Sequence, residues 1–143
     1  NCVIDKVNFK SKTKENSNYC YIKFNECIFQ RVTFNNVNLS WATFENARIE
    51  KNSVFKGVDF EETDFSSTLF SGVTFENVDF EKTIFKNTSL NDVTFRDTES
   101  IKKLFEEGAI KSSSHIKIDS VTKQTILDEE WLRLKDSYSI EFI

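Results

Sequence analysis

The chain has 143 residues, a formal net charge of −4 and no proline or methionine, whereas phenylalanine occurs 15 times. This length corresponds to one domain, and the mild negative charge argues against direct binding to nucleic acid, which requires a basic surface. The sequence contains no apolar run of the length that a membrane span needs, which is about 18 residues.

A five-residue period organises the first two thirds of the chain. A large apolar residue returns at almost every fifth position, and a small or β-branched residue lies two positions before it. An extended chain points residues i−2 and i to the same side, so each repeat directs one pair inward and turns at the two polar positions that follow. Four such right-angled turns, one per repeat, close a square. The 17 central residues are Ile4, Phe9, Phe24, Phe29, Phe34, Leu39, Phe44, Ile49, Phe55, Phe60, Phe65, Phe70, Phe75, Phe80, Phe85, Leu90 and Phe95.

This pattern resembles the repeats of the pentapeptide-repeat proteins, with phenylalanine as the usual central residue. The resemblance implies a right-handed quadrilateral β-helix. We therefore expect an all-β solenoid of about four to five coils over residues 1–97, and a small, mainly α-helical C-terminal cap over residues 98–143. Residues four repeats apart should stack. We expect one column of rings from Phe24, Phe44, Phe65 and Phe85, and a second from Phe34, Phe55, Phe75 and Phe95.

Two segments interrupt the period. Residues 10–19 would place Lys12 and Lys14 in inward positions, where unpaired charges are costly. They are interpreted as an exposed loop insertion, with a degenerate pair of repeats as the alternative. Between Ile49 and Phe55 the spacing is six, which predicts a bulge near residues 50–54 at Lys51 or Asn52. Either break can be a recognition feature or a tolerated insertion.

The three cysteines do not have metal-site spacing. Cys2 and Cys27 occupy small inward positions of the repeat, where a thiol acts as a small apolar group. We therefore expect buried free thiols. This expectation favours a reducing compartment and predicts a cytoplasmic location.

The C-terminal third should close the exposed end of the solenoid. Asp97 or Thr98 is predicted to cap a helix near residues 99–107 that ends at Gly108. Strand-like alternation follows around Ile116 and Ile118, and a short strand is expected at residues 139–143. A second helix is predicted near residues 128–137. It should pack on the last coil or on the first helix, with homodimer formation as the alternative. Its candidate contact residues are Leu127, Trp131, Leu134 and Tyr138.

The sequence contains no pattern that predicts catalysis, a cofactor site or a metal site. His115, the single histidine, lies in a serine-rich linker and is interpreted as a solvated loop residue. The two N-glycosylation sequons at Asn38 and Asn87 are interpreted as accidental in a chain so rich in Asn, Ser and Thr. We therefore predict that the protein is not an enzyme.

Acidic residues dominate the stretch from Gly57 to Glu81, which contains seven acids and no basic residue. With four repeats per coil, Asp59 should stack on Asp79 and Glu61 on Glu81, whereas Lys56, Glu76 and Arg96 should form a self-compensating column. The acids are either a solubilising surface or a face that binds a basic partner. The candidate interaction face comprises Asp59, Glu61, Glu62, Asp64, Glu76, Asp79 and Glu81.

Three functional hypotheses remain open. The first is a non-catalytic scaffold that binds an unidentified protein partner, as a monomer or a C-terminal-helix homodimer. The second is a DNA-mimicking gyrase-binding protein, which the resemblance to the quinolone-resistance branch of the family implies. The third is an extracytoplasmic or lumenal loop domain, in which Cys2 and Cys27 would not be free thiols.

Overall fold

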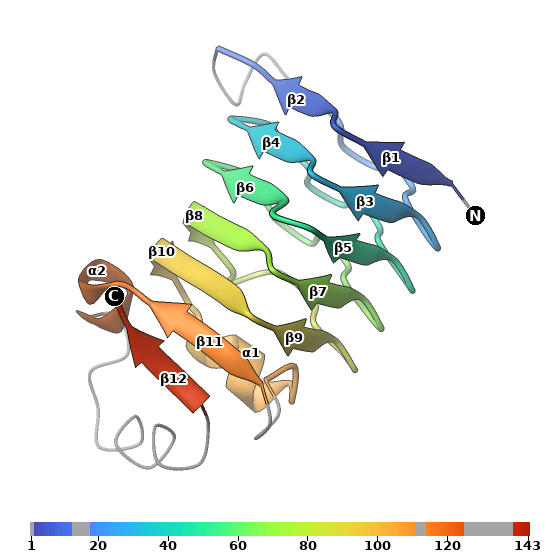
Figure 1. The fold of residues 1–143 in the computed structure, drawn as a ribbon. Helices are drawn as coiled ribbons and strands as arrows, with labels where there is room; N and C mark the ends of the chain where they lie inside the picture. Colours follow the sequence, from blue (N-terminus) through green and yellow to red (C-terminus); the bar gives the residue numbers. More distant parts are fainter. Residues whose placement is uncertain (1, 13–17, 111–113, 125–138) are drawn as a thin grey trace.

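The computed structural model describes residues 2–12, 18–110, 114–124 and 139–143. In this part of the chain, short parallel strands stack into two sheets that form adjacent walls of a solenoid (Figure 1). In spatial order, the first sheet consists of β1 (Val3–Asp5), β3 (Ile28–Gln30), β5 (Arg48–Glu50), β7 (Leu69–Ser71) and β9 (Ser89–Asn91). The second consists of β2 (Asn8–Lys10), β4 (Thr33–Asn35), β6 (Val54–Lys56), β8 (Thr74–Asp79), β10 (Val93–Glu99), β11 (His115–Ile118) and β12 (Ser139–Phe142).

In the described residues, the other two walls contain mainly isolated parallel bridges between coils. On one of them, the ends of β8 and β10 also pair, through Asp79 and Glu99. The wall that we call the Asp59 wall presents one residue per coil at the same outward position: Asn18, Asn38, Asp59 and Asp79. The wall that we call the Asp64 wall presents Lys23, Thr43, Asp64 and Ile84. The four walls confirm the predicted quadrilateral β-helix, although the solenoid makes about 6 turns and the expected four to five coils were too few.

The interior is filled by the central residues of the repeat. In the first predicted column, ring centroids lie 5.2 Å apart for Phe24 and Phe44, 4.9 Å for Phe44 and Phe65, and 5.7 Å for Phe65 and Phe85. The second column is also confirmed, and Phe9 extends it at 4.7 Å from Phe34. Every central residue from Phe24 to Phe95 is buried, whereas Ile4 and Phe9 at the N-terminal end are only half-buried.

The register of the strands locates both interruptions. Ile4 pairs with Phe29 and Phe9 with Phe34, so the first coil is longer than a regular coil by one pentapeptide. Because β2 extends to Lys10 and Asn18 already bridges to Asn38, this insertion lies between them. It is therefore shorter than the ten-residue loop predicted. Lys12 is exposed, as expected, and Lys14 lies outside the described residues.

The predicted bulge lies where the spacing placed it. Lys51 and Asn52 both have positive φ, 57° and 63°. The inserted residue increases the sequence separation between paired residues of neighbouring coils by one, because Arg48 pairs with Leu69 instead of Thr68. Ser53 then returns the chain to the interior. Its buried hydroxyl accepts a hydrogen bond from the Val32 N–H at 3.1 Å and donates one to the Glu50 carbonyl at 2.8 Å.

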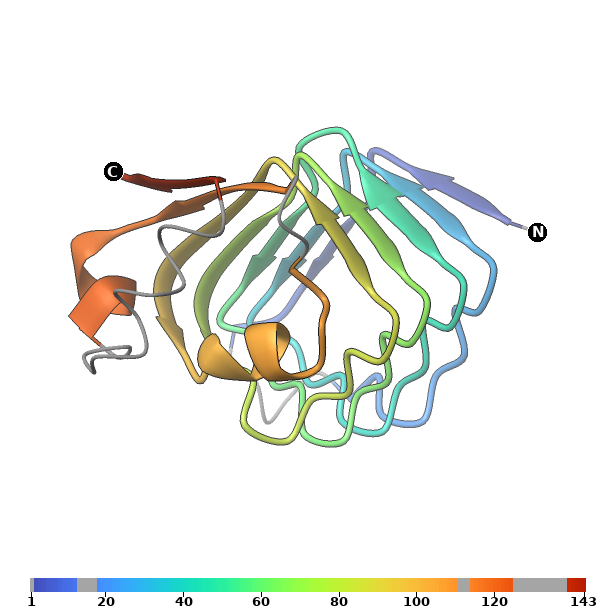
Figure 2. The ribbon, with the colours of Figure 1, turned by 90° about the horizontal axis from the view of Figure 1, so that it is seen from below.

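Helix α1 (Lys102–Glu106) lies across the C-terminal end of the coils (Figure 2). Ile101 and Leu104 are buried there, and Phe105 is half-buried. The predicted cap was wrong, because the helix begins after Ile101 without a side-chain cap. Thr98 instead belongs to β10, where its hydroxyl donates to the Arg96 carbonyl at 2.9 Å.

Beyond α1, the chain continues the second sheet. β11 pairs with β10 and β12 pairs with β11, both in parallel, so the expected tail strand extends the sheet by one more rung. Between them lies α2 (Ser120–Gln124), a short helix that the sequence did not predict. The helix predicted near residues 128–137 lies outside the described residues. In the described part of the chain, no helix is long and apolar enough to cross a membrane.

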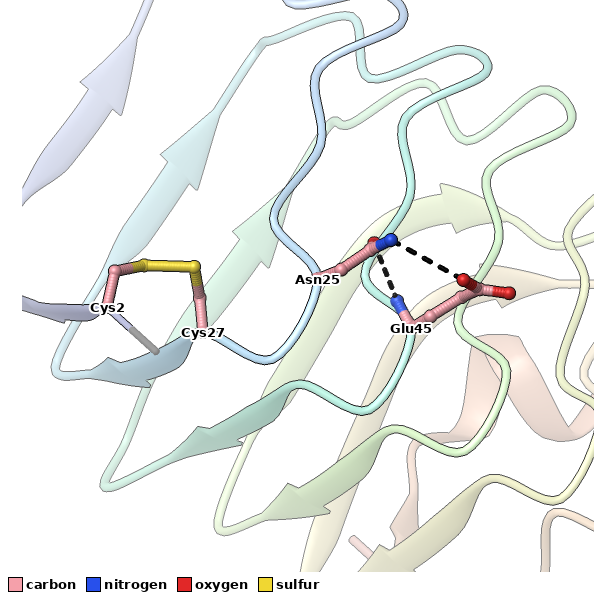
Figure 3. Close-up of a disulfide and its surroundings, with 4 residues drawn as sticks. All are labelled: Cys2, Asn25, Cys27 and Glu45. Carbon is pink, nitrogen blue, oxygen red and sulfur yellow. Dashed lines mark hydrogen bonds between the residues drawn. A yellow bond between two sulfur atoms is a disulfide. The ribbon is translucent and has the colours of Figure 1, made fainter.

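A disulfide joins the first two coils, between Cys2 and Cys27 (Figure 3). The expectation of two buried free thiols was therefore wrong: Cys27 is buried, but Cys2 lies at the exposed N-terminal edge. The repeat puts both residues at the same position of consecutive coils, with Cα atoms 4.7 Å apart, which lies within the range that a disulfide spans. Nearby, Asn25 and Glu45 point toward each other across neighbouring coils, and the Glu45 N–H donates to Asn25 Oδ1 at 3.1 Å.

Candidate binding surface

The three aspartates among the predicted face residues form turns. Asp59 Oδ1 accepts a hydrogen bond from the Glu61 N–H at 3.1 Å, Asp64 Oδ1 from the Ser66 N–H at 2.7 Å, and Asp79 Oδ1 from the Glu81 N–H at 3.0 Å. Such contacts two residues along the chain stabilise a change of direction. The aspartates therefore have a structural role at the corners of the solenoid.

Glu76 lies on the second sheet and not beside the other acids. Its carboxylate forms an ion pair with Lys56 Nζ at 2.7 Å, and the register places Lys56, Glu76 and Arg96 on consecutive strands. This confirms the predicted self-compensating column. Asp64 is also separate from the other acids, because it lies on the wall named after it. Two of the seven predicted face residues, Glu76 and Asp64, therefore lie on walls other than the Asp59 wall.

The remaining five acids gather on the Asp59 wall and its adjoining corner. Asp59, Glu61, Asp79 and Glu81 line one shallow hollow together with Lys82, and the exposed Glu62 follows Glu61 at the corner. Lys82 Nζ contacts Glu61 Oε1 at 2.6 Å. This hydrogen bond, together with the charge of Glu61, raises the pKa of Lys82. We call these five acids the acidic cluster.

An exposed aromatic pair adjoins this cluster, and the sequence interpretation missed it. Tyr21 and Trp41 stack with ring centroids 5.4 Å apart and an interplanar angle of 10°. Their exposed fractions are 69% and 43%. Each is the second residue after an inward residue, Tyr19 or Leu39, and the two occupy the same position of consecutive coils. Aromatic residues at two equivalent, otherwise polar corner positions were the signal available in the sequence.

His115 is not a loop residue. It lies on β11, half-buried, with Nδ1 3.4 Å from Asp92 Oδ1 and Nε2 3.4 Å from Glu141 Oε2. Lys117 Nζ is also 3.4 Å from Asp92 Oδ1. The histidine therefore connects the last repeat corner to β12, at the end of the solenoid opposite Tyr21.

The remaining candidates from the sequence are a metal site and the contacts of the second predicted helix. Among the described residues, no group of three His, Cys, Asp or Glu side chains could hold a metal ion. The candidate dimer or cap contacts Leu127, Trp131, Leu134 and Tyr138 lie outside the described residues. The Asp59 wall and its adjoining corner thus combine exposed rings with five carboxylates and with the ammonium groups of Lys82 and Lys103.

Family models match the repeat architecture. Residues 20–50 and 51–94 match two models described as pentapeptide repeats, which together cover more than half of the chain. A solved structure of a trypsin-treated variant of QnrB1, a plasmid-mediated fluoroquinolone resistance protein, is 11% identical with a TM-score of 0.25, over 99% of this chain and 91% of that one. A comparison with curated proteins finds no match. The chain belongs to the pentapeptide-repeat family.

Proposed function

We propose that this chain is a non-catalytic protein-binding module whose outer walls contact a protein partner. Phenylalanine rings seal the interior of the solenoid, so a ligand is bound from outside. The observation that carries the proposal is the exposed Tyr21–Trp41 stack. Tyrosine and tryptophan are enriched among the few residues that provide most of the energy of protein interfaces.

A photo-crosslinking experiment tests the proposal. A photoreactive amino acid is placed at one exposed position of each wall, and the full chain is irradiated in its native cells. The four positions are Arg48, Lys56, Glu81 and Ile84. We expect one discrete protein adduct from Glu81, beside the Asp59 wall, and none from Lys56, on the second sheet. The absence of a discrete protein adduct from all four walls would contradict the proposed function.

The disulfide favours the third sequence hypothesis for location. Disulfides persist in oxidising compartments and are rare in the cytosol, so the Cys2–Cys27 bond supports an extracytoplasmic domain over the cytoplasmic location that buried thiols predicted. Acid quenching of cells followed by alkylation and peptide mass spectrometry distinguishes the two. Recovery of alkylated Cys2 and Cys27 from native protein would support the cytoplasmic location.

The gyrase-binding alternative gains less support from the structure. A DNA mimic needs a continuous acidic surface, whereas Lys56 and Lys82 form ion pairs with two of the seven predicted acids. Two acids also lie on walls other than the Asp59 wall. A gyrase supercoiling assay tests this alternative, and inhibition or protection at micromolar protein would support it.

A further inference from the structure

One corner of the solenoid combines exposed rings with exposed charge. The same position on successive coils carries Tyr21, Trp41, Glu62 and Lys82. Backbone hydrogen bonds tie these rungs together: the Tyr21 N–H donates to the Ser40 carbonyl, the Trp41 N–H to the Glu61 carbonyl, and the Glu62 N–H to the Lys82 carbonyl. The stacked rings and the acidic cluster are therefore continuous along one edge of the molecule. We call this edge the Trp41 corner.

The fold itself does not require aromatic residues at the Trp41 corner. Tyr21 and Trp41 have φ of 61° and 57°, in the left-handed region that bulky residues rarely adopt. Equivalent corner positions elsewhere in the solenoid, such as Asn46 and Asn87, carry asparagine at φ of 57°, and asparagine tolerates this conformation far better. The rings also lie outside the core, with more than two fifths of each side chain exposed.

The charge beside the rings is strongly negative. Five carboxylates lie on the wall and the corner that follow Trp41. Two ammonium groups accompany them: Lys82 is paired with Glu61, and Lys103 Nζ donates to the Glu81 carbonyl at 2.8 Å. The faces of aromatic rings are also negative, because of their quadrupole. Both features attract a cation. Arginine suits them best, since its planar guanidinium stacks on rings and donates in a fork to carboxylates.

We propose that the Trp41 corner binds an arginine-rich segment of a partner protein, with one guanidinium against the Tyr21–Trp41 pair and a second on Glu61 and Glu62. The inference rests on the proposed protein-binding function and adds the chemistry of the partner. It assigns the rings as the anchor and the acidic cluster as the source of charge complementarity.

Fluorescence polarisation with a labelled peptide of alternating Arg and Gly tests this inference on the full chain, at low and at high salt. Matched peptides contain Lys or Glu in place of Arg. We expect the Arg peptide to bind most tightly and the Glu peptide not to bind. The Tyr21→Asn/Trp41→Asn variant should bind roughly tenfold more weakly, because it removes both rings of the pair that contacts one guanidinium. The Glu61→Gln/Glu62→Gln variant should bind more weakly and lose part of the salt dependence.

Two controls keep the result interpretable. Ile84→Ala removes an exposed apolar side chain from the Asp64 wall and should leave peptide binding unchanged. The Tyr21→Asn/Trp41→Asn variant should keep its thermal midpoint, since asparagine already occupies equivalent corners. A large fall in that midpoint would show that the pair stabilises the fold and would overturn the assignment.

The outcomes separate this inference from the proposed function. If the Arg peptide does not bind, or binds the double asparagine variant equally well, the Trp41 corner is not the arginine site. Equal binding of the Lys peptide would overturn the choice of arginine. In each case, a protein adduct from any wall in the crosslinking experiment would leave the proposed function standing.

Discussion

Buried threonines connect successive coils through their hydroxyl groups. Thr63, Thr68 and Thr88 occupy the small inward position, and their hydroxyls donate to the carbonyls of Leu39, Phe44 and Phe65 at 2.7–2.8 Å. Each of these acceptors is the central residue of a repeat in the preceding coil. The repeat therefore accepts Thr as readily as Val, because the buried hydroxyl finds a backbone partner.

A single carboxylate organises the turn after β11. Asp119 Oδ1 accepts from the Thr122 N–H at 2.8 Å, and its Oδ2 accepts from the Asp97 N–H at 3.0 Å. Burial raises the pKa of Asp119, but the hydrogen bonds from Thr122 and Asp97 and the charge of Arg96 outweigh it, so the pKa is lowered. The carboxylate thus caps α2 and joins it to β10.

Asp119→Asn should therefore destabilise the protein in a pH-dependent manner. A lowered pKa in the folded state adds stability above the unfolded pKa of about 3.9, and this stability is lost as the pH falls through the folded value. The difference in free energy of unfolding between the wild type and the variant should be constant from about pH 7 to about pH 5 and shrink below about pH 4. Urea unfolding at each pH measures it, and a difference that is independent of pH would contradict the assignment.

Individual strands of this protein are too short to be stable alone. Most strands in the described part of the chain are three residues long, and each gains stability only by pairing with the coils above and below it. Among the described strands, β1 has a partner on one side only, where the Ile28 N–H donates to the Cys2 carbonyl at 2.8 Å. The disulfide fastens the chain at this position, so it secures the edge where pairing is weakest.

Removal of the disulfide should loosen the first coil. In Cys2→Ala/Cys27→Ala, a closed loop with a sequence separation of 25 is opened, which is expected to cost about 3 kcal/mol. Amide hydrogen exchange should accelerate in β1 and β2 and change little in β8 and β10. Cys20→Ala, which alters a cysteine outside the disulfide, is the matched control. Equal acceleration in all strands would contradict a local role.

The whole molecule behaves as a stack in which each coil contacts its neighbours. Phe75 lies between Phe55 and Phe95 in one column and is 1% exposed, whereas Phe9 begins the same column and is half-buried. Stability in such a stack is approximately the sum of terms for each coil and each interface. A ring in the middle therefore contributes to two interfaces, and a ring at the end to one.

Truncation of Phe75 should therefore lower the free energy of unfolding more than truncation of Phe9. Phe75→Ala is expected to lower the free energy of unfolding by about 3–5 kcal/mol. Phe9→Ala should lower it by about 1–2 kcal/mol, since part of that ring is already in water. Chemical denaturation of both variants provides the comparison. An equal loss of free energy of unfolding in the two variants would contradict the idea that a middle ring contributes to two interfaces and an end ring to one.

The sequence was sufficient for the repeat architecture and insufficient for its surface. A large apolar residue at every fifth position, with a small residue two before it, predicted the columns through Phe44 and Phe75, and the one six-residue spacing predicted the bulge at Lys51 or Asn52. The resemblance to the pentapeptide-repeat family supplied the quadrilateral β-helix. The sequence did not predict three contacts: the pairing of Cys2 with Cys27, the stack of Tyr21 on Trp41, and the position of His115 between Asp92 and Glu141.

Each of these contacts depends on the register in which neighbouring coils stack, and the extra pentapeptide in the first coil shifts that register. Periodicity determines which residues face inward, whereas tertiary structure decides which outward residues become neighbours, because contact on a wall requires the coils to be stacked first.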